Sequence, residues 1–458
     1  MKEFDAIIIG FGKGGKTLAA ELANRGKEVA IIERSDKMYG GTCINIGCIP
    51  TKTLVHQSKI ASTLKNTSWE ERKVFYREAI AIKEEVTTVL RGKNYHNLAD
   101  HPHVTVYTGI GSFVSSDTVS VRTLTEEMLL RSNRIVINTG AEVVVPAIKG
   151  VTGNPFVYTS TSLMELSELP ARLVIVGGGY IGLEFASMFA SFGSKVTILE
   201  SYPELIMRED RDIAASVKEI LEKRGIEFRM NAKVQSITYT DKTAITQMID
   251  LPSGQVVELE SEAVLLATGR KPNTELLNLK AAGVEQDERG AILVDEYLKT
   301  SNPHVYAIGD VKGGLQFTYI SLDDYRIIRD SWFGEATRRT TDRQPVSYSV
   351  FIDPPLSHIG INEEEARRLN LDVIIKKLPV AAIPRAKTLG EADGLLKAVI
   401  DKQTRKIIGC TLLAPESSEV INTVAIAMKA GLDSNFLSNF IFTHPSMSEA
   451  LNDLFSVS

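Results

Sequence analysis

The chain has 458 residues, 43% of them hydrophobic and 24% charged, which is typical of a globular protein of roughly three domains. A net charge of −5 without a basic stripe argues against a nucleic-acid binder, and no apolar run is long enough to span a membrane. The three cysteines, Cys43, Cys48 and Cys410, are too few for a disulfide-stapled secreted scaffold. The first predicted strand leaves no room for a signal peptide, so we expect a cytoplasmic protein.

The chain opens with a strand, a glycine-rich turn, a helix and a second strand. An apolar strand over 6–9 leads into the turn 10–15, and a helix over 16–24 precedes a strand over 29–33 that ends in Glu33. Glycines at such a turn let backbone N–H groups approach a pyrophosphate at the helix N-terminus, and the acid accepts hydrogen bonds from an adenosine ribose.

A second copy of this pattern begins near residue 173. A strand over 173–176 leads into the glycine turn 177–182, and after a helix that ends at 192 a strand over 195–199 is followed by Glu200. In both copies the acid lies 23 residues after the first glycine. A single copy would be compatible with an ordinary turn containing incidental glycines, but two copies with equal spacing predict two dinucleotide sites.

The predicted secondary structure differs between the remaining segments of the chain. Residues 57–100 look helical, residues 104–145 look strand-rich, and residues 226–268 alternate strands and turns. From about residue 345 we expect a third, α+β domain. Its predicted strands lie near 349–361, 372–383 and 395–413, and its predicted helices near 363–369 and 417–431.

Two cysteines five residues apart, Cys43 and Cys48, open a helix just after the first glycine pattern, where a bound flavin would lie. A pair that cycles between dithiol and disulfide needs both sulfurs close together and one thiolate stabilised by a helix N-terminus or a cation. The alternatives are two buried cysteines or half of a metal site. Because there is no second cysteine pair, a four-thiolate zinc site is excluded, and we predict no metal site.

With these motifs the chain resembles, over essentially its whole length, the class I flavin-dependent pyridine nucleotide–disulfide oxidoreductases. The family's motifs match residues 10–15 for FAD, 43–48 for the redox pair, 177–182 for the nicotinamide nucleotide, 300–310 for a second FAD contact, and 444–449 for a C-terminal His-Pro…Glu motif. The resemblance implies an α/β fold of two Rossmann-like dinucleotide-binding domains plus a C-terminal α+β dimerisation domain. The expected segments are 1–147 (FAD, with the redox disulfide), 148–268 (NAD), 269–340 (FAD and central) and 341–458 (dimerisation).

The resemblance also implies roles for the catalytic residues. Cys48 would be the charge-transfer thiol beside FAD, and Cys43 the interchange thiol that faces the substrate. Lys52 and Glu184 match an ion pair beside the flavin, although Glu184 alone would be taken for a solvated helix acid. Tyr180 matches a residue that covers the empty nicotinamide pocket in some relatives.

The C-terminal motif implies a homodimer with an active site shared between subunits. His444 would come from the second subunit and exchange a proton near Cys43, and Glu449 would orient it. By residue type alone, His444 could equally be a packing histidine. Cys410 lies in an apolar strand and is expected to be buried without a redox role.

The expected cofactors are FAD and NADH, with NADPH less favoured, because Glu200 would accept from a free ribose 2′-hydroxyl and repel a 2′-phosphate. The candidate FAD residues are Gly10, Gly12, Gly14, Gly15, Glu33, Arg34, Gly41, Thr42, Lys52, Gly111, Thr139, Gly140, Gly309, Asp310, Gln316, Phe317 and Thr318. The candidate NAD residues are Gly177, Gly179, Tyr180, Ile181, Gly182, Glu184, Glu200 and Gly269.

The substrate is expected to be small, because the tail 452–458 has no cysteine relay and an oxidant would reach Cys43 directly. Several stretches resemble the bacterial RclA or hypothiocyanous acid reductase branch, which is tied to reactive chlorine resistance: 11–13, 38–40, 92–98, 313–326, 380–385 and 442–449. We therefore predict an NADH-dependent flavoprotein reductase of hypothiocyanous acid or related oxidants. Reduction of Cu(II) or another metal ion, a dihydrolipoamide dehydrogenase-like activity and a flavin-binding sensor remain open as alternatives.

Overall fold

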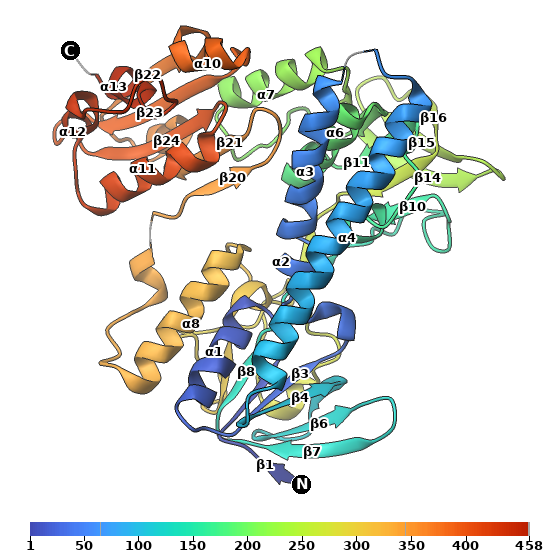
Figure 1. Ribbon diagram of the computed structural model, residues 1–458, viewed down its shortest axis with the longest axis vertical. Coiled ribbons are helices and arrows are strands. Elements are labelled where there is room, and N and C mark those ends of the chain that lie inside the picture. The colour runs from blue at the N-terminus through green and yellow to red at the C-terminus, as the bar shows by residue number, and fades with distance from the viewer. Residues whose placement is uncertain (65, 344, 457–458) are drawn as a thin grey trace. The chain divides into compact units, whose positions relative to one another are not determined.

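The computed structural model describes residues 1–64, 66–343 and 345–456 and has a mixed α/β fold (Figure 1). It divides into two compact units. Unit 1 contains 1–54, 78–145 and 269–343, and unit 2 contains 55–77, 146–268 and the chain from 344 onward. The α/β fold class is confirmed, whereas the predicted segment boundaries stay a prediction. The last predicted segment includes 344 and 457–458, which lie outside the described residues.

Unit 1 is built on a five-stranded parallel sheet in the order β19-β8-β2-β3-β4. Its strands are β19 (Val305–Ala307), β8 (Ile135–Ile137), β2 (Ala6–Ile9), β3 (Val29–Glu33) and β4 (Val104–Thr108). Strand side chains alternate between faces, so Ile7 and Ile9 enter one core while Ala6 and Ile8 enter the other. This burial on both faces explains why β2 is a continuous apolar run.

Helices cover one face of this sheet, and a second sheet covers the other. Helices α1 (Lys13–Asn24) and α8 (Thr318–Phe333) lie side by side (Figure 1). The second sheet has the order β1-β7-β6-β5, with β1 (Lys2–Glu3), β5 (Ile110–Phe113), β6 (Thr118–Arg122) and β7 (Glu127–Arg131). The shorter elements are η1 (Asp36–Met38), α2 (Thr42–Asn45), β9 (Ala141–Val143), β18 (Arg270–Pro272), η2 (Leu279–Ala282), η3 (Gly309–Lys312) and η4 (Thr340–Arg343).

Two long helices contribute to both units, α3 (Cys48–Thr63) and α4 (Trp69–Ala99). They account for the helical character expected over 57–100. Helix α1 begins at Lys13, three residues earlier than predicted, because the turn after Gly12 is already helical. Helix α8 was not predicted.

Unit 2 contains the second parallel sheet, in the order β10-β17-β11-β12-β13. Its strands are β10 (Val157–Thr159), β17 (Ala263–Leu266), β11 (Arg172–Val176), β12 (Lys195–Leu199) and β13 (Glu227–Arg229). An antiparallel sheet of β14 (Ala232–Tyr239), β15 (Ala244–Asp250) and β16 (Val256–Ser261) shares a core with it. The helices of this part are α5 (Ser160–Leu163), α6 (Tyr180–Phe192) and α7 (Arg211–Lys223).

The rest of unit 2 is an antiparallel sheet in the order β20-β21-β24-β23-β22. Its strands are β20 (Tyr348–Val350), β21 (Leu356–Gly360), β22 (Val373–Pro379), β23 (Leu395–Asp401) and β24 (Ile407–Leu413). The helical elements are α9 (Glu363–Arg368), η5 (Val380–Ala382), α10 (Pro384–Leu389), α11 (Ser417–Lys429), α12 (Ser434–Asn439) and α13 (Ala450–Phe455). The expected α+β character is confirmed, and Cys410 is buried in β24 as predicted.

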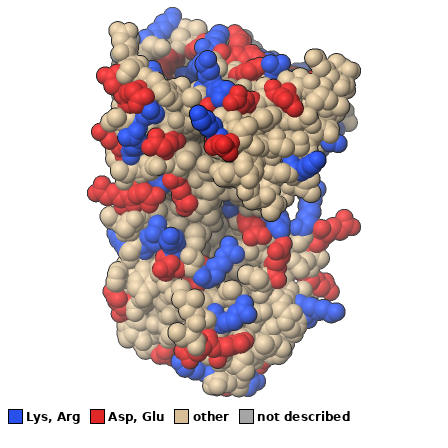
Figure 2. All heavy atoms as spheres, turned by 90° about the vertical axis from the view of Figure 1, so that its right-hand side faces the viewer, with Lys and Arg blue, Asp and Glu red and all other residues tan. Residues whose placement is uncertain are grey.

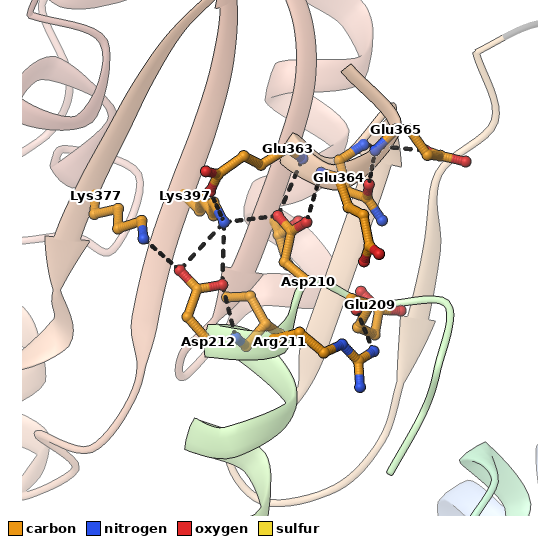
Figure 3. Close-up of polar contacts among 12 residues, drawn as sticks. Glu209, Asp210, Arg211, Asp212, Glu363, Glu364, Glu365, Lys377 and Lys397 are labelled. Atoms are coloured by element: carbon orange, nitrogen blue, oxygen red, sulfur yellow. Dashed lines mark hydrogen bonds and ion pairs between the residues drawn. The ribbon is translucent and has the colours of Figure 1, made fainter. Parts of the chain in front are cut away.

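A buried lysine links the sheet β20-β21-β24-β23-β22 to the start of α7. Figure 3 shows Lys397 of β23, which is 2% exposed, among three carboxylates. Its ammonium lies 2.8 Å from Asp210, 3.0 Å from Asp212 and 2.6 Å from Glu363. Asp210 also accepts the backbone N–H groups of Glu363 and Glu364 at the start of α9. This cluster fixes the start of α7 against the antiparallel sheet.

Acidic and basic side chains are interspersed on the face of the molecule in Figure 2, in keeping with the small net charge. None of the described helices combines the length and the apolar character needed to cross a bilayer.

Candidate active site

The first glycine turn lies at the carboxyl end of β2 and packs against Asn138. Gly10 has a φ of +105°, and a Cβ atom there would lie 2.3 Å from the carbonyl oxygen of Asn138. The side-chain oxygen of Asn138 accepts the N–H of Gly15 at 2.9 Å, and a Cβ atom at Gly12 would lie 2.6 Å from that oxygen. Only glycine fits at these positions, which keeps the backbone open to a pyrophosphate beside the N-terminus of α1.

Two carboxylates, the buried Glu33 and the partly buried Asp310, are candidates for contacts with the same cofactor. Glu33, at the end of β3, accepts the backbone N–H groups of Phe11 at 3.1 Å and Ser35 at 3.3 Å, and burial raises the pKa of its carboxyl. Burial also raises the pKa of Asp310, against the charges of Arg270 and Lys312. Among the described residues no donor forms a hydrogen bond with the Asp310 carboxylate. Both acids therefore fit a cofactor that brings hydroxyl groups, such as the ribose and ribityl chain of FAD.

Several other FAD candidates surround the same turn. A Cβ atom at Gly41 would lie 2.6 Å from the Cα atom of Gly12, so the redox loop, residues 40–48, lies directly on the glycine turn. Thr42 begins α2, and a Cβ atom at Gly140 would lie 3.8 Å from its hydroxyl. The hydroxyl of Thr139 donates to the carbonyl of Asn273 at 2.8 Å.

The last FAD candidates are more scattered. Gly14 packs on the carbonyl of Ser321, Arg34 directly follows Glu33, and Gly309 donates its N–H to Asp324 at 2.7 Å. Phe317 stacks on Tyr319, and Gln316 is exposed. Gly111 lies in β5 against Ile9 and Ile32, a packing position in the core of unit 1. The assignment of these residues to FAD stays a prediction.

Cys43 and Cys48 lie side by side as free thiols joined by a hydrogen bond between their side chains. That hydrogen bond, the Thr318 hydroxyl at 3.6 Å, the charge of Lys52 and a backbone N–H lower the pKa of Cys48 to about 6, against the effect of burial. The hydrogen bond and burial raise the pKa of Cys43. Cys48 is therefore the sulfur that carries the negative charge, and Cys43 remains a half-buried thiol.

Three polar residues that complete this region were missed from the sequence: Asn138, Ser321 and Asp324. Asn138 also donates to the carbonyl of Ile308 at 3.0 Å, and the hydroxyl of Ser321 accepts the N–H of Gly14 at 3.1 Å. Asp324 is fully buried on α8. The only signal for Asn138 was its place at the end of the apolar run before Thr139.

The second glycine turn, in unit 2, repeats this geometry. Gly177 has a φ of +110°, and a Cβ atom at Gly182 would lie 2.1 Å from the carbonyl oxygen of Gly177. Gly179 is the N-cap of α6, which contains Tyr180, Ile181 and Glu184. Glu200 follows β12 and accepts the N–H of Gly178 at 2.8 Å, so the acid again lies beside the turn. Gly269, with a φ of +103°, belongs to unit 1.

Tyr180 is held by a carboxylate that the sequence did not single out. Its hydroxyl and that of Tyr348 each donate to the same oxygen of Glu209 at 2.5 Å, and Glu209 is 1% exposed. Burial and the charge of Glu209 raise the pKa values of both tyrosines. Both phenols therefore stay protonated as donors to Glu209.

Three of the remaining catalytic candidates, His444, Glu449 and Glu184, have hydrogen-bond partners within unit 2. Nδ1 of His444 lies 2.9 Å from the carboxylate of Glu449, and the histidine side chain is exposed. The carboxylate of Glu184 accepts the backbone N–H of Phe351 at 2.7 Å. The ion pair implied between Lys52 and Glu184 would join the two units and stays a prediction. No group of three or more His, Cys, Asp and Glu side chains suited to a metal ion occurs in the described ranges.

Comparisons with known proteins agree with this geometry. The family model of the pyridine nucleotide-disulphide oxidoreductases matches residues 4–324, and the model of the family's dimerisation domain matches residues 346–455. The chain is 50% identical over 457 residues to the probable pyridine nucleotide-disulfide oxidoreductase RclA of Escherichia coli, with 100% of both chains covered. It is 33% identical to a mercuric reductase of Lysinibacillus sphaericus, covering 98% of this chain and 81% of that protein.

Comparison with solved structures supports the same family. The Cu(II) complex of the HOCl-induced flavoprotein disulfide reductase RclA of Escherichia coli superposes with a TM-score of 0.93 at 49% identity, covering 99% of each chain. The family implies FAD and a pyridine nucleotide as cofactors. The chain therefore belongs to the pyridine nucleotide-disulphide oxidoreductase family and is a flavoprotein disulfide oxidoreductase similar to RclA.

Proposed function

We propose that this protein is an NADH-dependent reductase that removes a small oxidant, hypothiocyanous acid or a related product of reactive chlorine, and so protects against oxidative stress. The observation that carries the proposal is the thiol pair, in which Cys48 holds the charge and Cys43 is the half-buried thiol. The likeness to an HOCl-induced reductase supports an oxidant as substrate. A small oxidant needs no cysteine beyond this pair, because it reaches Cys43 directly.

The cofactor assignments rest on the two glycine turns. Buried Glu33 and partly buried Asp310 would hold FAD by its ribose and ribityl hydroxyls. FAD held there would supply the two-electron chemistry that links the reduced nicotinamide to the disulfide. Glu200 lies where it would accept from a free ribose 2′-hydroxyl, and its charge would repel a 2′-phosphate. NADH is therefore the proposed electron donor.

The reaction at the thiols takes two steps. The thiol of Cys43 passes its proton to the His444–Glu449 pair of the second subunit as its sulfur attacks the sulfur of hypothiocyanous acid. This attack forms a Cys43–SCN bond and breaks the S–O bond to release hydroxide. The thiolate of Cys48 then attacks the Cys43 sulfur, which closes the disulfide and releases thiocyanate. The oxidant is reduced by two electrons and the thiol pair is oxidised by two.

A proton for the leaving hydroxide would come from the His444–Glu449 pair of the second subunit. His444 is exposed in a single chain and Glu449 is partly buried, as expected for a histidine that works in a neighbouring site. The matched dimerisation segment also exposes large apolar side chains, among them Ile426, Phe440 and Ile441, the last 92% exposed. Burying such groups in a homodimer would remove them from water. A homodimer with shared active sites is therefore part of the proposal.

Reduction of Cu(II) is the second candidate, because a solved relative is a Cu(II) complex. The two thiols could supply electrons to a bound Cu(II) ion as substrate. A Cu(II) ion at the two thiols would take its further ligands from solvent or from the second subunit. In the part of the chain that the structure describes, no group of three or more His, Cys, Asp and Glu side chains is suited to a metal ion.

The test is anaerobic oxidation of NADH by the FAD-loaded enzyme with micromolar hypothiocyanous acid. Lipoamide, oxidised glutathione and Cu(II) serve as matched oxidants, and Cys43→Ser as the control variant. Fast turnover with hypothiocyanous acid that is lost in Cys43→Ser supports the proposal. Turnover mainly with lipoamide would assign the protein to dithiol metabolism, and turnover only with Cu(II) would favour the second candidate.

A further inference from the structure

Lys16 places a cation beside the redox loop. It follows Gly15 on α1, and its ammonium donates a hydrogen bond to the side-chain oxygen of Asn94 on α4. Lys16 and the sulfur of Cys43 are close enough to interact electrostatically. None of the roles derived above for the glycine turn or the thiol pair requires a lysine at this position.

The redox loop is braced from the same side by α4. The side chain of Arg91 donates to Asn45 at 2.8 Å, and Asn45 donates to the carbonyls of Tyr39 and Gly41 at 2.9 Å each. A Cβ atom at Gly40 would lie 3.3 Å from the side-chain carbon of Asn94. Helix α4 therefore fixes the loop that carries Cys43 and also holds the ammonium of Lys16.

The charge of Lys16 is not neutralised by the protein. No carboxylate of the described residues forms an ion pair with it, and its side chain is partly buried. Burial and the neighbouring charge of Lys13 lower the pKa of Lys16 to about 8, while Cys43 opposes this effect. A lysine kept for packing alone would be expected to reach water or an acid. A half-buried ammonium with only an amide partner instead favours an anion.

We propose that Lys16 and Asn94 form a subsite for a small monovalent anion beside Cys43, which favours anionic oxidants such as hypothiocyanite over neutral disulfides. This inference rests on the proposed function and specifies its substrate as the anion. The ammonium of Lys16 holds the anion while Cys43 forms the S–S bond and the S–O bond breaks. The leaving oxide takes one proton from the Cys43 thiol and one from the His444–Glu449 pair of the second subunit and becomes water. Cys48, as the thiolate, then closes the disulfide, and thiocyanate leaves as the anion. Lys16 keeps its proton throughout and acts as a positioning residue.

The subsite can be tested without any oxidant. In the NADH-reduced, FAD-loaded enzyme, Cys43 is alkylated with iodoacetate, an anion, or with iodoacetamide, its neutral counterpart with the same leaving group. The rate ratio of the two reagents reports the charge beside Cys43, because thiol reactivity affects both rates equally. Peptide mass spectrometry separates Cys43 from Cys48.

Lys16→Met is expected to lower the iodoacetate-to-iodoacetamide ratio roughly three- to tenfold, the effect of removing one charge about 4 Å away in a water-like dielectric. Lys16→Arg keeps the charge and should keep most of the ratio. Lys93→Met is the matched control, because Lys93 is the exposed neighbour of Asn94 on the same helix. An unchanged ratio in Lys16→Met, or an equal fall in both rates, overturns the subsite. Retained FAD absorbance and thermal midpoint establish that the variant folds.

Turnover then separates this inference from the proposed function. Lys16→Met should lower kcat/KM for hypothiocyanous acid several-fold while NADH oxidation by ferricyanide, which bypasses the thiols, is unchanged. If the alkylation ratio falls as expected but the wild-type enzyme does not reduce hypothiocyanous acid, the subsite stands and the proposed substrate is wrong. If hypothiocyanous acid is reduced equally by wild type and Lys16→Met and the ratio is unchanged, the function stands and the subsite is wrong.

Discussion

The hydroxyl oxygen of Thr318 lies 3.6 Å from the sulfur of Cys48, although 270 residues separate them in the chain. Thr318 is the first residue of α8, and this helix returns to pack beside α1. The contact therefore joins the start of α8, which follows the second FAD motif, to the start of α3. It also gives the Cys48 thiolate a hydrogen-bond donor in addition to the Cys43 thiol.

Replacing Thr318 by Val should raise the pKa of Cys48. In the wild type the pKa is about 6, so the thiolate is present at neutral pH and is lost as the pH falls through 6. Without the hydroxyl donor we expect the midpoint of the thiolate titration to rise by roughly one pH unit. Ultraviolet absorbance of the thiolate in the NADH-reduced enzyme measures this midpoint. Thr318→Ser keeps the hydroxyl and should titrate like the wild type, and a similar shift in both variants would contradict the role of the hydrogen bond.

Glu200→Gln should relax the choice of nicotinamide nucleotide. The carboxylate lies beside the second glycine turn, and its removal takes away the repulsion of a 2′-phosphate. We expect kcat/KM for NADPH to rise about tenfold while that for NADH falls, because one unfavourable charge contact is lost. Steady-state rates with the two nucleotides measure the effect, with Glu204→Gln, an exposed acid on the following loop, as control. Equal use of both nucleotides by the wild type would already contradict the assignment of NADH.

The two strand–turn–helix–strand segments could be predicted from the sequence because their signals are local. The glycines, the apolar strands and the terminal acids Glu33 and Glu200 all lie within a short window, and the structure places each acid beside its own turn. The redox pair was predicted for the same reason: Cys43 and Cys48 are neighbours in the sequence and open consecutive helical segments.

The contacts that the sequence did not predict are long-range. Lys397 sits in an apolar strand, and its burial depends on Asp210 and Asp212, which come 187 and 185 residues earlier. Tyr180 and Tyr348 meet only through Glu209. The sequence did not indicate a role for Lys16, because Asn94 and Cys43 come close to it only in the folded chain. Nothing in the local pattern of any of these segments specifies the partner.

Lys397→Met should destabilise unit 2 strongly. The substitution keeps the apolar stem but leaves three carboxylates close together without their cation. Removing one partner of a buried ion pair costs about 3 to 5 kcal/mol. Lys377→Met is the matched control, since Lys377 pairs with Asp212 but is 47% exposed, and such a pair contributes below about 1 kcal/mol. Urea unfolding followed by circular dichroism at one protein concentration compares the two, and equal midpoints would contradict the role of burial.

The anion preference at Cys43 should depend on pH through Lys16. Its ammonium is protonated below a pKa of about 8, so the iodoacetate-to-iodoacetamide ratio should be high at pH 7 and fall as the pH rises through 8. The titrating groups that act on it are Lys13 on α1 and Cys43 on the redox loop, whereas its partner on α4, Asn94, is uncharged. Ionisation of Cys43 cancels in the ratio. In Lys16→Arg the ratio should stay constant across this range, and a matching fall in that variant would show that another group titrates.

Mixed dimers can show whether His444 serves the neighbouring subunit. Cys43→Ser and His444→Ala should each be nearly inactive with the oxidant as homodimers. If each site combines Cys43 of one subunit with His444 of the other, a mixed dimer has one intact site. Random exchange of equal amounts should then restore about a quarter of wild-type activity, because half of the dimers are mixed and each has one working site of two. If Cys43 and His444 of the same subunit formed the site, each mixed dimer would hold one site without Cys43 and one without His444, and mixing would restore nothing.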